Sequence, residues 1–523
     1  MKYLYGASIQ GIQEFIFATN RLKEIIGASE LVESISTELF KEILKELKIE
    51  EESYKIVVMA AGNVRILFDN LEDVKKIFDI APKRVMQKAY GITLSQAVEK
   101  VEENLTRDDI DRLERKLKSA RNIATSPLDS SLNATYISPR TGKSASEIIK
   151  VQKKEEFVDR ATAQKDKASE DGKHRLLEKI GFDPKDKATI KKFSNEISKL
   201  SNSKNKIAII HADGNGLGMI LQKIGEAMEK NPTHLTEVYS QFSKYLDEST
   251  IEATKTAFEK SFREEDDIFR FRPVVLGGDD LTIICDVDRS LTFIENFLRE
   301  FEIETKKRMS SLGDEFNIDS IKDGLTACAG IAYCNEKFPF HYAIHLAEEL
   351  CSYSKKYSKE IDSKNPPSSI AFHNIQSSYL DSFSSIQESE LRLGSDKGEI
   401  HLDFAPYYLH SSHKLYTNLP TIKALRENIS LLMQENSPAS RLRNWLNIVE
   451  DSQELANFAL KRVIEMSQER GFDIDDFDRR LKRLNPNLSP ENLIITQYRD
   501  SKNILTTPIY NILQIYTISG ATQ

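Results

Sequence analysis

Two segments of the chain align with each other without a gap, and they constrain the fold more than any other feature. The segments YKIVVMAAGNVRILFD at 54–69 and RPVVLGGDDLTIICD at 272–286 each consist of two apolar runs around a central turn. Two such runs, joined by residues that tolerate positive φ, predict a β-hairpin. In the alignment, residues 60–63 fall on residues 277–280. The chain is therefore expected to contain two copies of one small unit.

The apolar pattern around both hairpins predicts the same order of elements. In the second copy we expect a strand at 206–214, helical residues at 217–260, the hairpin, a helix at 289–308, a strand at 325–333 and a helix at 340–356. The first hundred residues repeat this plan, with the strand KYLYGAS and a helical stretch before the hairpin. The order β-α-β-β-α-β is that of a ferredoxin-like palm domain. The predicted fold class is α+β, with two palm domains.

A length of 523 residues is too great for one hydrophobic core. The expected domains are a first palm at 1–110, a helical connector at 111–205, a second palm at 206–362 and an α-helical C-terminal domain at 363–523. Residues 140–206 carry 18 Lys and Arg against 11 Asp and Glu, although the net charge of the whole chain is −8. This bias predicts either a solvated connector or a face that contacts phosphate or RNA.

Composition excludes several classes of protein. No run of about 20 apolar residues could cross a bilayer, and the N-terminus MKYLYGASIQG lacks the segments of a secretory signal. The four cysteines, Cys285, Cys328, Cys334 and Cys351, include no CxxC pair, so neither a disulfide framework nor a cysteine zinc site is expected. We expect a cytoplasmic protein that does not bind membranes.

Three aspartates of the second copy are the main candidates for a functional site. Asp213 ends the first strand, and Asp279 and Asp280 lie in the hairpin beside it. Crowded carboxylates repel one another and require a cation, and oxygen ligands suit Mg²⁺ or Mn²⁺. Two such ions can stabilise the attacking and leaving oxygens of a nucleotidyl transfer. The alternative is an acidic turn with no catalytic or metal-binding role, because Asp and Gly are common in turns.

Two further features of the second copy are suited to phosphate. Gly214, Asn215 and Gly216 form a glycine-rich entry to a helix, where backbone amides can cradle a triphosphate. Lys355 lies near the end of the last palm helix, where it either contacts a triphosphate or favours the helix dipole.

The first copy lacks all three carboxylates. Ser8 stands where the second copy has Asp213, and Gly62 and Asn63 stand where it has the two hairpin aspartates. The first copy is therefore expected to have a structural role, and the second is expected to carry the catalytic residues.

The second copy resembles the palm of the polymerase-like large subunit of type III CRISPR effector complexes. The resemblance rests on DGN at 213–215, GGDD at 277–280, LTACAGIAYC at 325–334 and AEELCSYSK at 347–355. Further matching segments are GIQEFIF at 11–17, GAS at 27–29 and TTPIYNILQIY at 506–516.

The resemblance implies a cyclic oligonucleotide synthase. In that family paired palms bind two ATP molecules, and the GGDD palm joins them by a 3′–5′ linkage with loss of pyrophosphate. It implies two Mg²⁺ or Mn²⁺ ions, with the ligands Asp213, Gly214, Asp279 and Asp280. It implies nucleotide contacts at Gly214, Asn215, Gly216, Gly277, Gly278 and Lys355. The acceptor nucleotide would lie on the first palm, at Ser8, Gly62 and Asn63, without metal.

Three departures from the family qualify this expectation. The chain begins at the first palm, so no HD nuclease domain and no DNA cleavage by one are expected. The zinc cysteines are absent, and Asn215 stands where many relatives have a second acidic residue. The expected partners are ATP or another NTP, an activating RNA, CRISPR-type protein subunits and a second copy of the chain. The alternatives are a catalytically silent nucleotide-binding scaffold, or a cyclic dinucleotide or mononucleotide cyclase.

Overall fold

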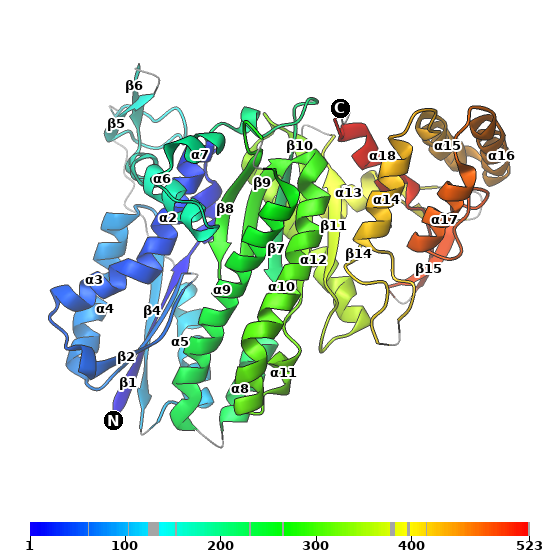
Figure 1. Cartoon of the computed structure of the whole chain (residues 1–523). Helices are drawn as coiled ribbons and strands as arrows, with labels where there is room; N and C mark the ends of the chain where they lie inside the picture. The colour runs from blue at the N-terminus through cyan, green and yellow to red at the C-terminus, as the bar shows by residue number, and fades with distance from the viewer. Residues whose placement is uncertain are drawn as a thin grey trace.

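The fold mixes helices with several sheets, which follow one another from the N-terminus to the C-terminus (Figure 1). The computed structural model describes residues 1–60, 62–102, 104–123, 135–151, 154–229, 232–263, 266–376, 382–394, 398–414, 416–500 and 502–520. Among the helices of these ranges, none is long and apolar enough to cross a membrane.

The first sheet has four antiparallel strands in the order β2-β3-β1-β4. The strands are β1 (Lys2–Gln10), β2 (Tyr54–Ala60), β3 (Asn63–Phe68) and β4 (Thr93–Val101). The accompanying helices are α1 (Ile12–Phe17), α2 (Leu22–Ser34), a π-helical turn (Ile35–Leu39), α3 (Phe40–Glu46), α4 (Leu71–Lys88) and α5 (Arg107–Arg121). The order along the chain and across the sheet is the βαββαβ plan that the sequence predicts.

The second sheet has six strands in the order β14-β11-β10-β7-β9-β8. Its strands are β7 (Lys206–Gly214), β8 (Phe271–Gly277), β9 (Asp280–Asp286), β10 (Ala327–Asn335), β11 (Ser369–Asn374) and β14 (Tyr407–Tyr408). Its helices are α8 (Leu217–Met228), α9 (Leu235–Ser261), α10 (Val287–Glu315), α11 (Asp319–Lys322) and α12 (Phe340–Ile361). The helix expected at 217–260 is thus two helices, which are separated by a short 3-10 turn (Pro232–His234).

The two hairpins agree in register as well as in sequence. The β2–β3 ladder shifts between Ile56 and Val58, and the β8–β9 ladder shifts between Pro273 and Val275. These are equivalent positions in the alignment, so both copies contain the same β-bulge. Ala61, the first-copy partner of Gly278 in the alignment, lies outside the described residues.

The region between the sheets was expected to be a helical connector, but it is only partly helical. It contains the antiparallel hairpin of β5 (Glu147–Val151) and β6 (Lys154–Val158), followed by α6 (Arg160–Lys179) and α7 (Lys187–Lys192). Helix α6 packs closely on α2, since a Cβ added at Gly27 would lie 1.8 Å from the carbonyl oxygen of Lys165. The prediction of a helical connector missed this hairpin because its charged residues mask two short apolar runs.

The expectation of a purely helical C-terminal domain from residue 363 is also wrong. Strands β11 and β14 belong to the second sheet, where β11 pairs in parallel with β10. A separate sheet contains β12 (Arg392–Leu393), β13 (Ile400–His401), β16 (Lys502–Thr506) and β15 (Ile495–Arg499). The helices are α13 (Phe383–Ser389), α14 (Ile422–Leu432), α15 (Ala439–Asp451), α16 (Gln453–Glu469), α17 (Ile474–Leu484) and α18 (Ile509–Ile518).

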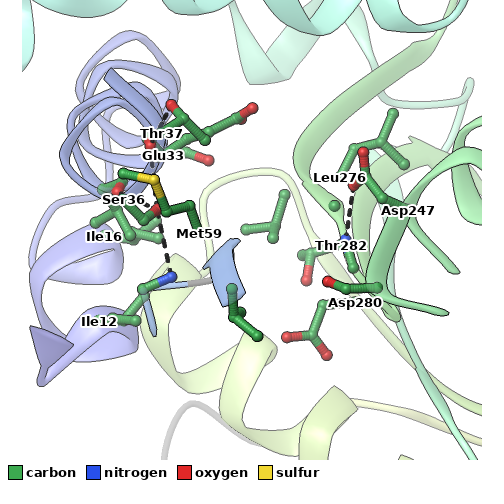
Figure 2. Close-up of a pocket in the computed structure, with 18 of the residues that line it drawn as sticks. Ile12, Ile16, Glu33, Ser36, Thr37, Met59, Asp247, Leu276, Asp280 and Thr282 are labelled. Carbon is green, nitrogen blue, oxygen red and sulfur yellow. Dashed lines mark hydrogen bonds between the residues drawn. The ribbon is translucent and has the colours of Figure 1, made fainter. Parts of the chain in front are cut away.

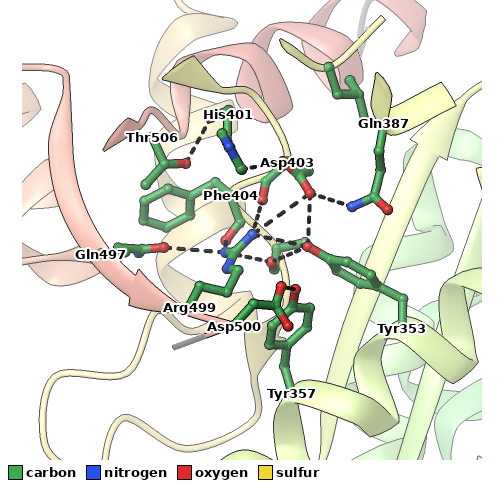
Figure 3. A network of polar contacts seen from close by, with 12 residues as sticks. Tyr353, Tyr357, Gln387, His401, Asp403, Phe404, Gln497, Arg499, Asp500 and Thr506 are labelled. Carbon is green, nitrogen blue, oxygen red and sulfur yellow. Dashed lines mark hydrogen bonds and ion pairs between the residues drawn. The ribbon is translucent and has the colours of Figure 1, made fainter. Parts of the chain in front are cut away.

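A buried polar network attaches this C-terminal region to helix α12 (Figure 3). The guanidinium of Arg499, which is 7% exposed, donates to the hydroxyl of Tyr353 at 3.0 Å and to the carbonyl oxygen of Asp403 at 2.7 Å. The Tyr353 hydroxyl donates to the Asp403 carboxylate at 3.0 Å. One turn further along α12, Tyr357 donates to Asp500 at 2.6 Å. Because these groups satisfy one another, the charges can be buried at the junction.

Candidate metal and nucleotide site

The three predicted aspartates lie together at one edge of the second sheet. One carboxylate oxygen from each of Asp213, Asp279 and Asp280 lies within 4.8 Å of the others, and all three side chains are half-buried. Strand β7 supplies the first and the β8–β9 hairpin supplies the other two. Residues Ala212 and Leu281 are paired across β7 and β9, so the next residues along, Asp213 and Asp280, are neighbours.

The electrostatics of this cluster indicate an excess of negative charge. Burial and then the hydrogen bond with Asp213 raise the pKa of Asp279 well above its usual range. Burial and the charge of Asp213 raise the pKa of Asp280 to about 7. Burial acts in the same direction on Asp213, but the hydrogen bond with Asp279 and the charge of Lys355 outweigh it, so the pKa of Asp213 is lowered. The three carboxylates therefore require a cation or a shared proton.

Lys355 supplies one positive charge to the cluster. Its amine donates to the carboxylate of Asp213 and, at 2.8 Å, to the carbonyl oxygen of Gly214. Three carboxylates, one ammonium and a backbone carbonyl leave a site of net negative charge with hard oxygen donors. This donor set fits Mg²⁺ or Mn²⁺.

A helix of the second palm fixes the hairpin turn that carries two of the aspartates. Gly278 has φ 63°, a conformation that favours glycine. Its N–H donates to the carboxylate of Asp247 on α9 at 2.9 Å, and its carbonyl oxygen accepts from the hydroxyl of Thr250 at 2.6 Å. Both backbone polar groups of the turn are thus held, which fixes the position of Asp279.

A cavity of about 420 Å³ lies between the two palms and opens onto this turn (Figure 2). Side chains from α1, α2 and β2 line one wall, among them Ile12, Glu33 and Met59. The opposite wall is formed by the second palm, including Asp247 and Asp280. The volume lies within the range of ligand sites for small molecules.

The predicted site residues divide between this cavity and its surroundings. Gly277, Gly278, Asp280 and Gly62 line the cavity. Asp213, Gly214, Asp279 and Lys355 form the adjacent polar cluster. Asn215 and Gly216 instead border a separate pocket of about 20 Å³.

Asn215 forms hydrogen bonds with Thr326. Its side chain is 4% exposed, and its amide nitrogen donates to the hydroxyl of Thr326 at 3.0 Å. Its backbone N–H donates to the carbonyl oxygen of Thr326 at 2.8 Å. Asn215 therefore fastens the turn after β7 to the residue before β10.

The first palm has a different set of groups at the equivalent positions. The hydroxyl of Ser8 donates to the side-chain oxygen of Asn63 at 3.1 Å and accepts from the guanidinium of Arg121 at 3.0 Å. Arg121 ends α5, which follows β4 as α12 follows β10. Each palm therefore directs a cation from its last helix to the end of its first strand: Arg121 to Ser8 and Lys355 to Asp213.

Sequence reasoning missed several residues of the cavity. Lys179 from α6 donates to the carbonyl oxygen of Leu276 at 2.8 Å and pairs with Glu33 at 2.7 Å, which joins the two walls. For His211, by contrast, the sequence favours a packed or hydrogen-bonded strand histidine. In the structure its Nδ1 lies 3.1 Å from the Thr282 hydroxyl oxygen, burial lowers its pKa to about 4, and it also lines the cavity. The sequence places Asp247, Lys179 and Arg121 on unremarkable charged helices, so only the tertiary structure reveals them.

Comparison with known families gives two matches. The model of the Cas10/Cmr2 second palm domain matches residues 206–365, and that of Csm1 subunit domain B matches residues 1–153. The chain carries domains of the Cas10/Csm1 family. This is the large-subunit family of type III CRISPR complexes. The segment of this chain that the second-palm model matches contains the three aspartates. No curated protein matches the chain.

Solved structures of Csm1-Csm4 cassettes are similar to the chain at 16% sequence identity. The cassette in complex with one ATP has a TM-score of 0.46, and the apo cassette has a TM-score of 0.45; each match covers 68% of this chain and 53% of the other. The cassette in complex with cA4 has a TM-score of 0.43, with 69% and 53% covered. The chain thus spans about half the length of these Csm1 chains.

Proposed function

We propose that the protein is a metal-dependent nucleotidyltransferase that condenses nucleoside triphosphates, ATP first among them, into a cyclic oligonucleotide messenger for antiviral signalling. The observation that supports this function is the cluster of three carboxylates at a cavity between two palms. A cavity with two different palm walls suits two nucleotides, one on each wall. The family match at 206–365 supports the same reading.

The proposed mechanism assigns the binding of two Mg²⁺ or Mn²⁺ ions to Asp213, Asp279, Asp280 and the carbonyl oxygen of Gly214. When bound, such ions stabilise the attacking and leaving oxygens of an in-line displacement. The 3′-oxygen of one nucleotide forms a bond to the α-phosphorus of the other, the bond to pyrophosphate breaks, and the hydroxyl proton passes to solvent.

The remaining site residues position the nucleotides in this proposal. Gly277 and Gly278 present only backbone to the cavity, which permits close approach of a donor nucleotide. Lys355 lies beside Asp213 and contributes its positive charge to the triphosphate. On the first palm, Ser8, Asn63 and Gly62 hold the acceptor nucleotide, and we add Arg121 as the cation of that wall.

The test is incubation with α-labelled nucleoside triphosphates and Mg²⁺ or Mn²⁺, alone and with RNA and co-purified subunits. We expect the double variant Asp279→Asn/Asp280→Asn to lose product formation by a factor of at least about 100. Asp267→Asn, an exposed acidic residue, is the matched control and retains activity. Equal product from the double variant would refute the assignment, and the mass of the product distinguishes cyclic oligonucleotides from cyclic dinucleotides or mononucleotides.

One observation favours a second function, a silent nucleotide-binding scaffold of a defence complex. The ion pair between Lys355 and Asp213 neutralises one carboxylate without any metal. A scaffold binds nucleotide but forms no product, even with activating RNA, protein subunits or a second copy of the chain. Nucleotide binding without turnover in all these mixtures would therefore favour the scaffold over the enzyme.

A further inference from the structure

A second cavity of about 540 Å³ lies between the second palm and the C-terminal region. Its wall on the palm side includes Lys206 at the start of β7 and Asn374 at the end of β11. Its other walls come from α15 and α18 and from Glu390, Leu393 and Leu402. Because Asp213 lies seven residues along β7 from Lys206, the cavity is about 23 Å from the aspartate cluster. It is a separate site.

Three cations line this cavity, Lys204, Lys206 and Arg443. Lys204 donates to the carbonyl oxygen of Thr517 at 2.8 Å, and Arg443 donates to the hydroxyl of Thr517 at 2.7 Å. Lys206 donates to the side-chain oxygen of Asn374 at 3.2 Å. Within the described ranges, none of the three forms an ion pair. Burial lowers the pKa of Lys206.

The floor of the cavity combines apolar surface with an unsatisfied polar group. Leu402, Leu446, Leu513 and Ile518 are buried and supply the apolar part. Gln514 is 5% exposed, and its side-chain oxygen has no hydrogen-bond partner among the described residues. A buried acceptor of this kind destabilises the fold unless a donor satisfies it. The apolar part of the floor therefore suits the face of a flat ligand.

We propose that this cavity binds a nucleotide, with its base on the apolar floor beside Gln514 and its phosphate between Lys204 and Arg443. Lys206 completes the positive end of the site. The exposed carboxylate of Glu450, which also lines the cavity, is suited to accept from a ribose hydroxyl. The volume lies within the range for small-molecule sites. The nucleotide is either free or the terminal residue of a single strand.

The test is calorimetric titration of the whole protein in EDTA, which removes metal-supported binding at the palm. The probes are AMP, GMP, CMP and UMP, and a single-stranded RNA tetranucleotide. We expect saturable one-to-one binding of at least one probe, weakened about tenfold or more by Arg443→Ala and by Gln514→Leu. Lys461→Ala, a change on exposed α16, is the matched control and leaves the affinity unchanged.

Three results are decisive. The proposal is overturned if no probe binds at millimolar concentration. It is also overturned if Arg443→Ala binds the probe as tightly as the wild type, because the probe then binds at another site. Arg443 is exposed, so this variant remains informative even if Gln514→Leu does not fold. Tighter binding of the tetranucleotide than of every mononucleotide assigns the site to a strand end, and the reverse assigns it to a free nucleotide.

Discussion

Replacing Gly330 by alanine is expected to separate helix α12 from the second sheet. Gly330 lies in β10, and a Cβ at this position would lie 1.9 Å from the carbonyl oxygen of Ala347 and 2.5 Å from the backbone nitrogen of Cys351. Ordinary contact begins at 3.4 Å, so the helix must move away by about 1.5 Å. Overpacking of a core costs about 1–3 kcal/mol. Because both opposing atoms are backbone, we expect a loss near 3 kcal/mol.

The same displacement affects the aspartate cluster. Lys355 lies one turn beyond Cys351 on α12, and its 2.8 Å contact with the Gly214 carbonyl oxygen would lengthen to as much as about 4.3 Å, which is no hydrogen bond. Urea denaturation measures the stability, and Mn²⁺ titration measures the cluster. Gly218→Ala is the control, because a Cβ there meets nothing within 4 Å. If Gly330→Ala unfolds within about 0.5 kcal/mol of the wild type, the packing argument is wrong.

Three further changes test other parts of the structure. Burial lowers the pKa of Lys165 to about 8, below the ordinary value near 10.4. Between these two pH values the unfolded chain therefore binds more protons than the folded chain, so the folded state gains stability as pH rises. Urea denaturation should show the wild type gaining stability relative to Lys165→Met over this pH range. A stability difference between wild type and Lys165→Met that does not change with pH would contradict this prediction. Arg499→Met removes the donor to the Tyr353 hydroxyl and to the Asp403 carbonyl oxygen, while Arg392 still pairs with the Asp403 carboxylate at 2.6 Å. The loss of these two buried hydrogen bonds should cost at least about 2 kcal/mol in the same assay, whereas a loss below about 1 kcal/mol would contradict the network. Asp247→Ala removes the acceptor of the Gly278 N–H and should weaken Mn²⁺ binding about tenfold in a titration, and unchanged affinity would show that the turn does not depend on it.

The hairpin repeat was predictable because it depends on local pattern. Apolar runs and turn residues determine a hairpin over about 15 residues. The first-copy equivalents of Asp213 and Asp280, Ser8 and Asn63, lie opposite each other in the structure. The convergence of Asp213 with the hairpin followed from the order of elements alone. The shared bulge was not predicted, since it is a shift of pairing and not a residue type.

The C-terminal sheet could not be predicted, because its strands are short and distant in sequence. Strands β12 and β13 have two residues each, too few for an alternation to be visible. Strand β13 pairs with β16, and His401 lies opposite Thr506. Such pairing depends on the packing of the whole region, and so does the contact between Arg121 and Ser8.

Helix α12 has a consequence for the dynamics of the protein. Lys355 contacts the aspartate cluster, while the next residue, Lys356, pairs with Asp500, and Tyr353 lies in the buried network with Arg499. Local unfolding of α12 around residues 353–356 must break the contact of Lys355 with the aspartate cluster and the contacts with Arg499 and Asp500 together. Its amide protons should therefore exchange with solvent as one cooperative unit with the strand that carries Arg499. Ligand binding at the aspartates should then slow exchange in that strand, which belongs to a different sheet.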